Sequence, residues 1–327
     1  MRILFVHNAL RSFVRIDRDI LAEAHEVDEL DLSVPARIVS LPARLARTDI
    51  VFCWFASLHS FFPSVLGRGL SKPIISVVGA YDAANIPEIG FGHMGHPWKR
   101  HVVRAICGAS TLVICNSNYA VETVRRNVRP RAPIRMLHHG VSFPASAIDG
   151  PREQVALTVG QIRRVNLARK GHEVFAKAAA LVPDMTFMLV GEIMDGSAAH
   201  LHSLAPRNFK IRDHVPQAEL DALYLNALVY VQPSIHESFG LTVVEAMGAG
   251  EMPVVSRRGA LPEVVGDHGV FVDESSPKSV AAGIRQARDE PLARRLAASA
   301  YARETFPLSK RREGLLDAVD SVRRRRT

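Results

Sequence analysis

Short apolar runs rich in β-branched residues alternate with segments of helical spacing along the whole chain. Continuous runs of this length, without polar alternation, are typical of strands buried on both faces of a parallel sheet. In the first half they lie at 2–7, 49–55, 73–79 and 110–117, and a further predicted strand at 134–142 runs into a Gly-containing turn. Between them, apolar residues recur with the period of a helix, as at Ile16, Ile20 and Leu21. The pattern predicts a doubly wound α/β domain.

The same alternation restarts after residue 151. Strand-like runs lie at 154–162, 185–192, 209–216, 228–234, 251–257 and 269–274, with helical segments at 171–183, 217–227 and 278–289. At 327 residues the chain exceeds the usual size of a single core. Pro, Ser and Gly cluster at 142–154. We therefore expect two Rossmann-like domains, 1–148 and 149–306, followed by a helix at 307–327.

In doubly wound α/β domains, ligands bind beyond the carboxyl ends of the strands. Chemistry is therefore expected in the turns that follow the predicted strands of the second domain, after Gly160, Gly191, Val215, Ser234 and Ser256.

Composition and charge narrow the class of protein. With 47% hydrophobic and 23% charged residues, the chain is globular rather than disordered or fibrous. Its net charge of +8 attracts anionic substrates, an anionic membrane surface or nucleic acid. The chain carries no basic motif interleaved with aromatic residues, so we expect no nucleic-acid partner.

Cysteine usage and hydropathy predict a cytoplasmic protein. Cys53, Cys107 and Cys115 lie in apolar contexts without a metal-ligand spacing, as expected for reduced core residues. No apolar run reaches the length of a membrane span, and the apolar start is too short for a secretion signal.

Several residues of the first half could suggest a metal site. They are three histidines and two carboxylates, His93, His96, His101, Asp82 and Glu88. Their spacing fits no standard ligand set, so we expect no metal.

The stretch HESFGLTVVEAMGAG, residues 236–250, carries two glutamates eight positions apart. A helix beginning near Leu241 would present the amides of Gly240, Leu241 and Thr242 at its positive end, which favours phosphate. Glu245 lies one turn further on, roughly 6 Å along the axis, where it suits a ribose diol. Glu237 precedes the helix and suits hydroxyls beyond the phosphate. Alternatively, Glu237 caps the helix electrostatically and Glu245 is a solvated side chain.

A second constellation is VGQIRRVNLARKGHEVF, residues 159–175. The predicted strand ends at Gly160, and a loop before a helix near Gly171 carries four cations, Arg163, Arg164, Arg169 and Lys170. Forked guanidinium groups and a flexible ammonium suit a diphosphate whose charge must be held as it leaves. Taken alone, the segment also fits a solvated charged loop.

These two segments resemble those of the retaining glycosyltransferases of family 4, which have the GT-B fold. HESFGLTVVEAMGAG, with the PVVSRRGALPEVVGDHGVFV that follows Met252, is similar to the family's E-x7-E segment. VGQIRR…RKG is similar to its donor clamp, while CNSNYAVETV and LHHGVS resemble the end of its acceptor domain and the linker.

The resemblance implies a role for each matching residue. Glu237 would contact the donor sugar's hydroxyls and Glu245 the nucleotide ribose. The diphosphate would bind at Gly160, Lys170, one of Arg163 or Arg164, and the amides of Phe239, Gly240, Leu241 and Thr242. The base would lie near the backbone of His214 and Val215. The first domain would bind the acceptor, and the terminal helix would pack back on it.

The chain also departs from the family pattern. Gln161 stands where an Arg usually follows the Gly, and His7 to Leu10 replace a Gly-rich turn. Gly79 occupies the place of a usual histidine, so Tyr81 or Asp82 is expected to line the acceptor side instead.

The implied function is transfer of a hexose-type sugar from a UDP-, GDP- or ADP-sugar to a hydroxyl of a glycan, lipid or small molecule. The implied mechanism retains the anomeric configuration, follows a front-face route and needs no metal. Two alternatives remain: a sugar-nucleotide epimerase of the same architecture, and a non-catalytic protein that binds sugar nucleotides or glycans. The terminal run Arg323–Arg326 is either a frayed tail or a contact with the inner face of an anionic membrane.

Overall fold

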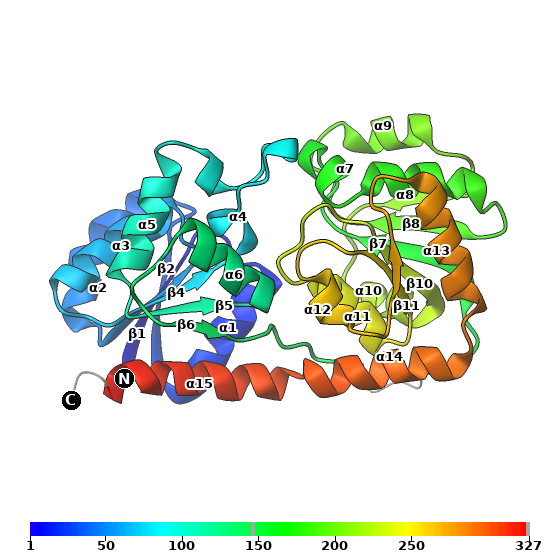
Figure 1. The fold of residues 1–327 in the computed structure, drawn as a ribbon. Helices are drawn as coiled ribbons and strands as arrows, with labels where there is room; N and C mark the ends of the chain where they lie inside the picture. The colour runs from blue at the N-terminus through cyan, green and yellow to red at the C-terminus, as the bar shows by residue number, and fades with distance from the viewer. Residues whose placement is uncertain (145–147, 325–327) are drawn as a thin grey trace. The chain divides into compact units, whose positions relative to one another are not determined.

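The computed structural model describes residues 1–144 and 148–324 and separates into two compact units. The first unit contains residues 1–140 and the segment from Leu308 onward, and the second contains Val141–Pro307. Each unit has a six-stranded sheet in which all pairings are parallel (Figure 1). The chain crosses between units at Gly140–Val141 and Pro307–Leu308, whereas the sequence places the domain boundaries at 148 and 306.

The first sheet has the strand order β2-β1-β3-β4-β5-β6. Its strands are β1 Arg2–His7, β2 Glu26–Asp31, β3 Ile50–Trp54, β4 Ile74–Val78, β5 Leu112–Cys115 and β6 Ile134–Met136. Its helices are α1 Ser12–Ala24, α2 Leu41–Arg47, α3 Leu58–Gly69, α4 Ala80–Ala83, α5 Lys99–Ala109 and α6 Asn118–Asn127. Along β3, Phe52 and Trp54 join one core while Val51 and Cys53 join another, because successive side chains point to opposite faces.

The terminal helix α15 Leu308–Arg324 completes the first unit and lies beside α1 (Figure 1). Leu315, Val319 and Val322 pack into the same core as Leu21. The expected return of this helix to the first domain is therefore confirmed. Within the described part of the chain, no helix has both the length and the apolar character that crossing a membrane requires.

The second sheet has the strand order β12-β11-β10-β7-β8-β9. Its strands are β7 Glu153–Val159, β8 Thr186–Val190, β9 Phe209–Arg212, β10 Ala227–Gln232, β11 Met252–Ser256 and β12 Val270–Val272. Its helices are α7 Arg164–Arg169, α8 His172–Ala178, α9 Ser197–Leu204, α10 Gln217–Asn226, α11 Leu241–Gly248, α12 Leu261–Val265, α13 Pro277–Asp289 and α14 Leu292–Thr305. The chain runs outward from β7 in one direction and returns to continue from β10 in the other, so the topological switch point lies between these two strands.

Several elements differ from the sequence-based expectation. Strand β2, of sequence EVDELD, escapes the apolar pattern because it is an edge strand with mostly half-exposed side chains. The expected loop before Gly171 contains the short helix α7, and the expected turn at 256–265 contains α12. Helix α5 begins only at Lys99, after a 3-10 turn at His93–Gly95 and the Pro97 that follows it.

Candidate functional site

Two cations and one carboxylate meet at the switch point of the second unit. Arg169 and Lys170 come from the segment after β7, and Glu237 comes from the loop after β10, the neighbouring strand. The Nζ of Lys170 lies 3.7 Å from Oε2 of Glu237, and a guanidinium nitrogen of Arg169 lies 4.0 Å from the same oxygen. The three side chains are only 12–15% exposed. Buried charges need partners, so this cluster is mutually stabilised.

Glycines allow the two loops to approach this closely. A Cβ on Gly160 would lie 2.9 Å from Cδ of Lys170, so the lysine stem lies directly on the backbone where β7 ends. Gly171 has a φ of +72°, and a Cβ there would lie 2.3 Å from the carbonyl oxygen of Pro233. Only glycine fits both the left-handed backbone and this contact at position 171.

The electrostatics keep Glu237 ionised. Burial alone would raise the pKa of Glu237, but Lys170 and Arg169 outweigh it and hold the pKa below its ordinary value. Burial also lowers the pKa of Lys170, which the negative charge of Glu237 opposes. An anionic group that enters beside Lys170 and Arg169 would find two cations already desolvated, which strengthens its attraction.

Gln232 links the predicted donor residues and was not identified from the sequence. It is buried at the last position of β10, and its Nε2 donates to Oε2 of Glu237 at 3.0 Å. Its Oε1 accepts from Thr242 Oγ1 at 3.0 Å and from the Tyr230 hydroxyl at 3.2 Å. Gln232 therefore fixes the orientation of one carboxylate oxygen of Glu237 and of the Thr242 side chain.

Helix α11 begins at this cluster without a side-chain cap. Its N-cap residue is Gly240, with a φ of +99°, which has no side chain to cap the first amides. Phe239 buries its ring against Phe306, with 5.5 Å between the centroids, so only its backbone can face a ligand. Leu241 and Thr242 are half-buried in the first turn. The positive end of a helix without a side-chain cap attracts anions, and this one lies beside the two cations.

Glu245 lies one turn into α11, where Oε2 accepts a hydrogen bond from the Tyr224 hydroxyl at 3.0 Å. Burial raises the pKa of Glu245 to about 7. Tyr224 is itself buried. The glutamate is thus a packed and hydrogen-bonded group rather than the solvated side chain that the alternative interpretation requires.

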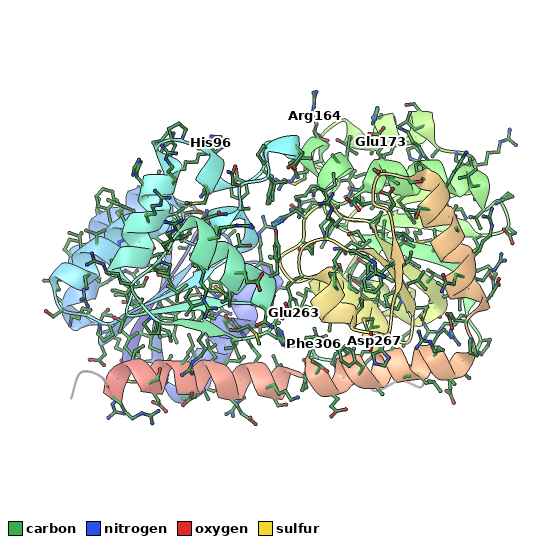
Figure 2. The ribbon with its side chains drawn as sticks, viewed as in Figure 1. His96, Arg164, Glu173, Glu263, Asp267 and Phe306 are labelled. Atoms are coloured by element: carbon green, nitrogen blue, oxygen red, sulfur yellow. The ribbon has the colours of Figure 1, made fainter. Side chains whose placement is uncertain are left out.

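Within the described part of the chain, the other predicted residues make no ion pair or hydrogen bond with Glu237. Arg163 is the N-cap residue of α7, and Arg164 is exposed and extends outward from it (Figure 2). His214 is exposed and Val215 half-buried after the edge strand β9. Arg169 instead reaches the carboxylate, because α7 turns its last residue towards the loop after β10. The signal was present in the sequence, since Arg169 directly precedes Lys170.

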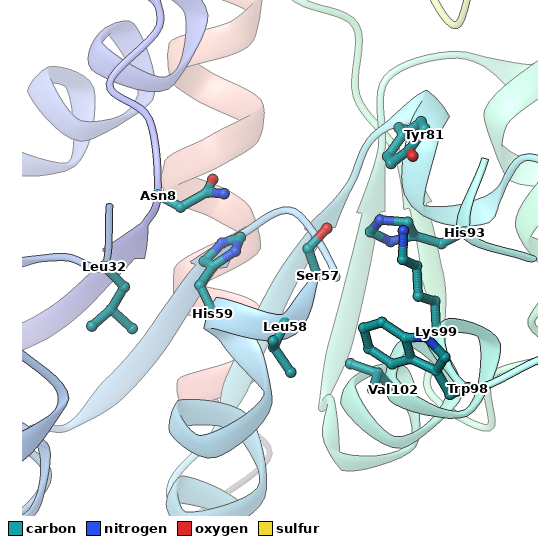
Figure 3. A pocket seen from close by; sticks show the side chains of 10 residues that line it. All are labelled: Asn8, Leu32, Ser57, Leu58, His59, Tyr81, His93, Trp98, Lys99 and Val102. Carbon is teal, nitrogen blue, oxygen red and sulfur yellow. The ribbon is translucent and has the colours of Figure 1, made fainter. Parts of the chain in front are cut away.

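The first unit has a separate pocket at the carboxyl ends of its strands. The pocket has a volume of about 330 Å³ and is lined by Asn8, Leu32, Ser57, Leu58, His59, Tyr81, His93, Trp98, Lys99 and Val102 (Figure 3). The rings of Tyr81 and His93 lie 4.5 Å apart, centroid to centroid. Aromatic faces beside hydroxyl, amide and imidazole groups suit a ligand with both apolar faces and hydroxyls.

Asp82 lies behind this pocket rather than in its lining. It is buried, and its carboxylate accepts from Ser57 Oγ at 2.8 Å and from the Gly79 amide at 2.9 Å. Burial raises the pKa of Asp82 to about 6. Of the two residues expected to line the acceptor side, the pocket therefore contains Tyr81, while Asp82 holds the Ser57 hydroxyl.

A family model matches the second unit of the chain. Residues 146–305 match the family model described as glycosyl transferases group 1. This segment contains every residue assigned to the donor site. The comparison supports a glycosyltransferase.

Curated relatives match over parts of their length. The chain is 39% identical over 84 residues to the O-antigen chain mannosyltransferase B of Escherichia coli, covering 26% of this chain and 22% of that protein. It is 29% identical over 267 residues to a D-inositol 3-phosphate glycosyltransferase of Pseudarthrobacter chlorophenolicus, covering 72% of this chain and 62% of the relative. The matched segments thus span between a fifth and two thirds of these proteins.

Solved structures match over nearly the whole chain. Anabaena HepE, in a complex with UDP and glucose, superposes with a TM-score of 0.78 at 17% identity, covering 98% of this chain and all of HepE. The sucrose-phosphate synthase of Thermosynechococcus elongatus gives a TM-score of 0.80 at 16% identity, covering 98% and 99% of the two chains. At this identity the likeness concerns the fold, and it confirms the GT-B fold predicted from the sequence.

Proposed function

We propose that the protein is a glycosyltransferase that transfers a hexose-type sugar from a nucleotide-diphosphate donor to an acceptor hydroxyl. The observation that carries the proposal is the cluster of Lys170, Arg169 and Glu237 at the uncapped start of α11. Two desolvated cations and a free helix start suit a diphosphate, and the adjacent fixed carboxylate suits sugar hydroxyls. The match of residues 146–305 to glycosyl transferases group 1 supports a glycosyltransferase.

Each group has a proposed role in donor binding. Lys170, Arg169 and the amides of 239–242 hold the diphosphate, so Arg169 takes the role that the family resemblance implies for Arg163 or Arg164. Glu237 accepts hydrogen bonds from the sugar, and Glu245 accepts them from the ribose. The base lies near the backbone at 214–215. UDP is the first nucleotide to test, because HepE was solved with it.

The proposed reaction retains the anomeric configuration by a front-face route. The bond between the anomeric carbon and the phosphate oxygen breaks as the acceptor oxygen bonds that carbon on the same face. The departing phosphate oxygen takes the acceptor proton. Glu237 is engaged by Gln232 Nε2 and by two cations, which favours hydroxyl binding over nucleophilic attack. The protein contributes charge stabilisation and positioning, without a metal. The pocket of the first unit is the proposed acceptor site.

Replacing Lys170 by Ala tests the proposal. The loss of a preorganised cation that faces the leaving diphosphate should lower kcat/KM about 10²–10³-fold, which corresponds to roughly 2.7–4 kcal/mol. Turnover is followed by nucleotide release from a panel of UDP-, GDP- and ADP-sugars with candidate acceptors. Lys177→Ala is the matched control, because this exposed lysine pairs only with Glu173 one turn away among its recorded ion pairs.

The same assay separates the alternatives. An epimerase would convert the donor without an acceptor, and a non-catalytic binder would release no nucleotide from any donor. Near-normal turnover of the Lys170 variant would contradict the assignment of the diphosphate site.

A further inference from the structure

Helix α3 of the first unit has an inverted distribution of side chains. Its buried face consists of small or compact residues, Ser60, Pro63, Ser64 and Gly67. Gly67 packs where a Cβ would lie 2.9 Å from Ile74, and Ser64 contacts Cys53 Sγ at 3.6 Å. The close approach of helix and sheet therefore leaves no room for large side chains on this face.

The large apolar residues of α3 face outward instead. Leu58, Phe62, Val65, Leu66 and the following Leu70 are between 39% and 59% exposed. The first four lie on one side of the helix, since they are separated by four, three and one residues. A contiguous apolar stripe on a helix surface marks an interaction site more often than scattered exposed residues do. We call these five residues the α3 stripe.

The surroundings of the α3 stripe are basic. Helices α2 and α5 pack beside α3 (Figure 1). Residues 33–72 contain five Lys and Arg side chains and 93–110 contain three. Arg37 and Arg44 pair with Asp31 and Asp28, which leaves six cations against the single carboxylate of Asp49 within these ranges. Arg47, Arg68, Arg100 and Arg104 are exposed. Trp98, 57% exposed at the start of α5, has its ring 5.7 Å from Nζ of Lys99.

We propose that the α3 stripe and its basic surroundings dock the protein on the surface of an anionic lipid bilayer. Apolar side chains enter the headgroup boundary while Lys and Arg attract anionic lipids, and tryptophan favours the same depth. A second copy of the chain fits less well, because a two-fold contact places identical basic residues against one another. The proposal places the membrane contact on the α3 stripe instead of on the terminal run Arg323–Arg326. Arg325 and Arg326 lie outside the described residues.

The docking surface adjoins the pocket of the first unit. Leu58 belongs to the α3 stripe and also lines that pocket, as does Trp98 (Figure 3). A docked protein would hold the pocket mouth close to the lipid headgroups. Membrane binding itself does not depend on the proposed transfer reaction, and the experiment below measures it without any substrate.

The test is co-sedimentation of the full chain with vesicles. Vesicles of phosphatidylcholine and phosphatidylglycerol in a ratio of about two to one should bind the protein, and vesicles of phosphatidylcholine alone should bind it at least tenfold more weakly. The double variant Phe62→Ser, Leu66→Ser should lose at least tenfold in partitioning to the mixed vesicles. Both positions are exposed, so an unchanged melting temperature verifies that the variant folds.

Matched variants separate the contributions. Leu292→Ser replaces a leucine of the second unit that is 40% exposed, and it should bind as the parent does. Arg68→Ser with Arg100→Ser should weaken binding to the mixed vesicles only. Equal binding by the parent and the Phe62, Leu66 variant, or no binding to either vesicle, would overturn the proposal. So would a lipid-free dimer that the same variant abolishes, because a second copy would then be the occupant.

Discussion

Gln232 sets the geometry of the candidate site although no contact with a ligand is assigned to it. It bridges Glu237 and Thr242 through two hydrogen bonds of 3.0 Å, and it accepts a third, of 3.2 Å, from the Tyr230 hydroxyl. Replacing it by Leu keeps the size but removes every bond. We expect kcat/KM to fall roughly 10–100-fold, because a hydrogen bond to a charged group contributes about 1.5–3 kcal/mol. The control is Gln286→Leu, which changes an exposed glutamine of α13.

Arg169 and Arg164 form a second matched pair, five residues apart on the same short segment. Arg169 lies beside Glu237, whereas Arg164 is exposed. Arg169→Ala should weaken the binding of UDP about tenfold, equivalent to about 1.4 kcal/mol, while Arg164→Ala should leave it unchanged. Isothermal titration measures both. If Arg164→Ala weakened UDP binding and Arg169→Ala did not, the diphosphate contact would belong to Arg164, as the sequence analysis allows.

Glu245 should make the stability of the second unit depend on pH. Burial raises its pKa to about 7, so between about 4.5 and 7 the folded state binds more protons than the unfolded state. Its contribution to stability is therefore present at low pH and is lost as the pH rises through 7. Glu245→Gln keeps an acceptor for Tyr224 but cannot ionise. Its melting temperature should fall less than that of the parent between pH 5 and pH 8, by roughly a few degrees. Parallel pH profiles would contradict this.

At the scale of elements, α15 is held on α1 by a buried ion pair. Arg311 contacts Asp17 at 2.6 and 2.9 Å, both side chains are 1% exposed, and Asp17 also accepts from the Trp54 indole at 3.0 Å. Arg311→Met should destabilise the first unit by about 3–5 kcal/mol, because it leaves a buried carboxylate without its cation. Adding Asp17→Asn should recover part of the loss, since Asn still accepts from Trp54. Urea denaturation measures both, and an Arg311 variant as stable as the parent would contradict the role of the pair.

Elements differ in how well the sequence predicts them. The strands β3, β4, β7 and β10 are mainly apolar because most of their residues are buried, so their existence and type follow from the pattern alone. Strand β2 pairs with β1 from Arg2–Glu26 to His7–Asp31, yet its charged residues give no strand pattern. Strand β2 is held by backbone hydrogen bonds to β1, and these do not depend on the polarity of its side chains.

At the scale of the whole molecule, the last segment belongs to the unit in which the chain began. A chain that ends at Pro307 should lose the cooperative unfolding of the first unit, because Leu315 and Val319 no longer fill its core. The second unit keeps its own two cores and should still gain stability from UDP by mass action. Calorimetry with and without UDP tests this. If the shortened chain still showed the unfolding transition of the first unit unchanged, α15 would contribute little to that core.

The sequence by itself predicted the two α/β domains, the segments to which the donor chemistry is assigned and, through its resemblance to a known family, the GT-B fold. Apolar periodicity and the spacing of Glu237, Gly240 and Glu245 are local properties, and local properties can be read along a chain. The tertiary structure decided that Arg169 rather than Arg164 reaches Glu237, and that Gln232 orients it, because β7 and β10 are neighbours although 67 residues separate Ala227 from Gly160. It also decided that α3 turns its small residues inward, because the narrow contact with the sheet excludes larger ones.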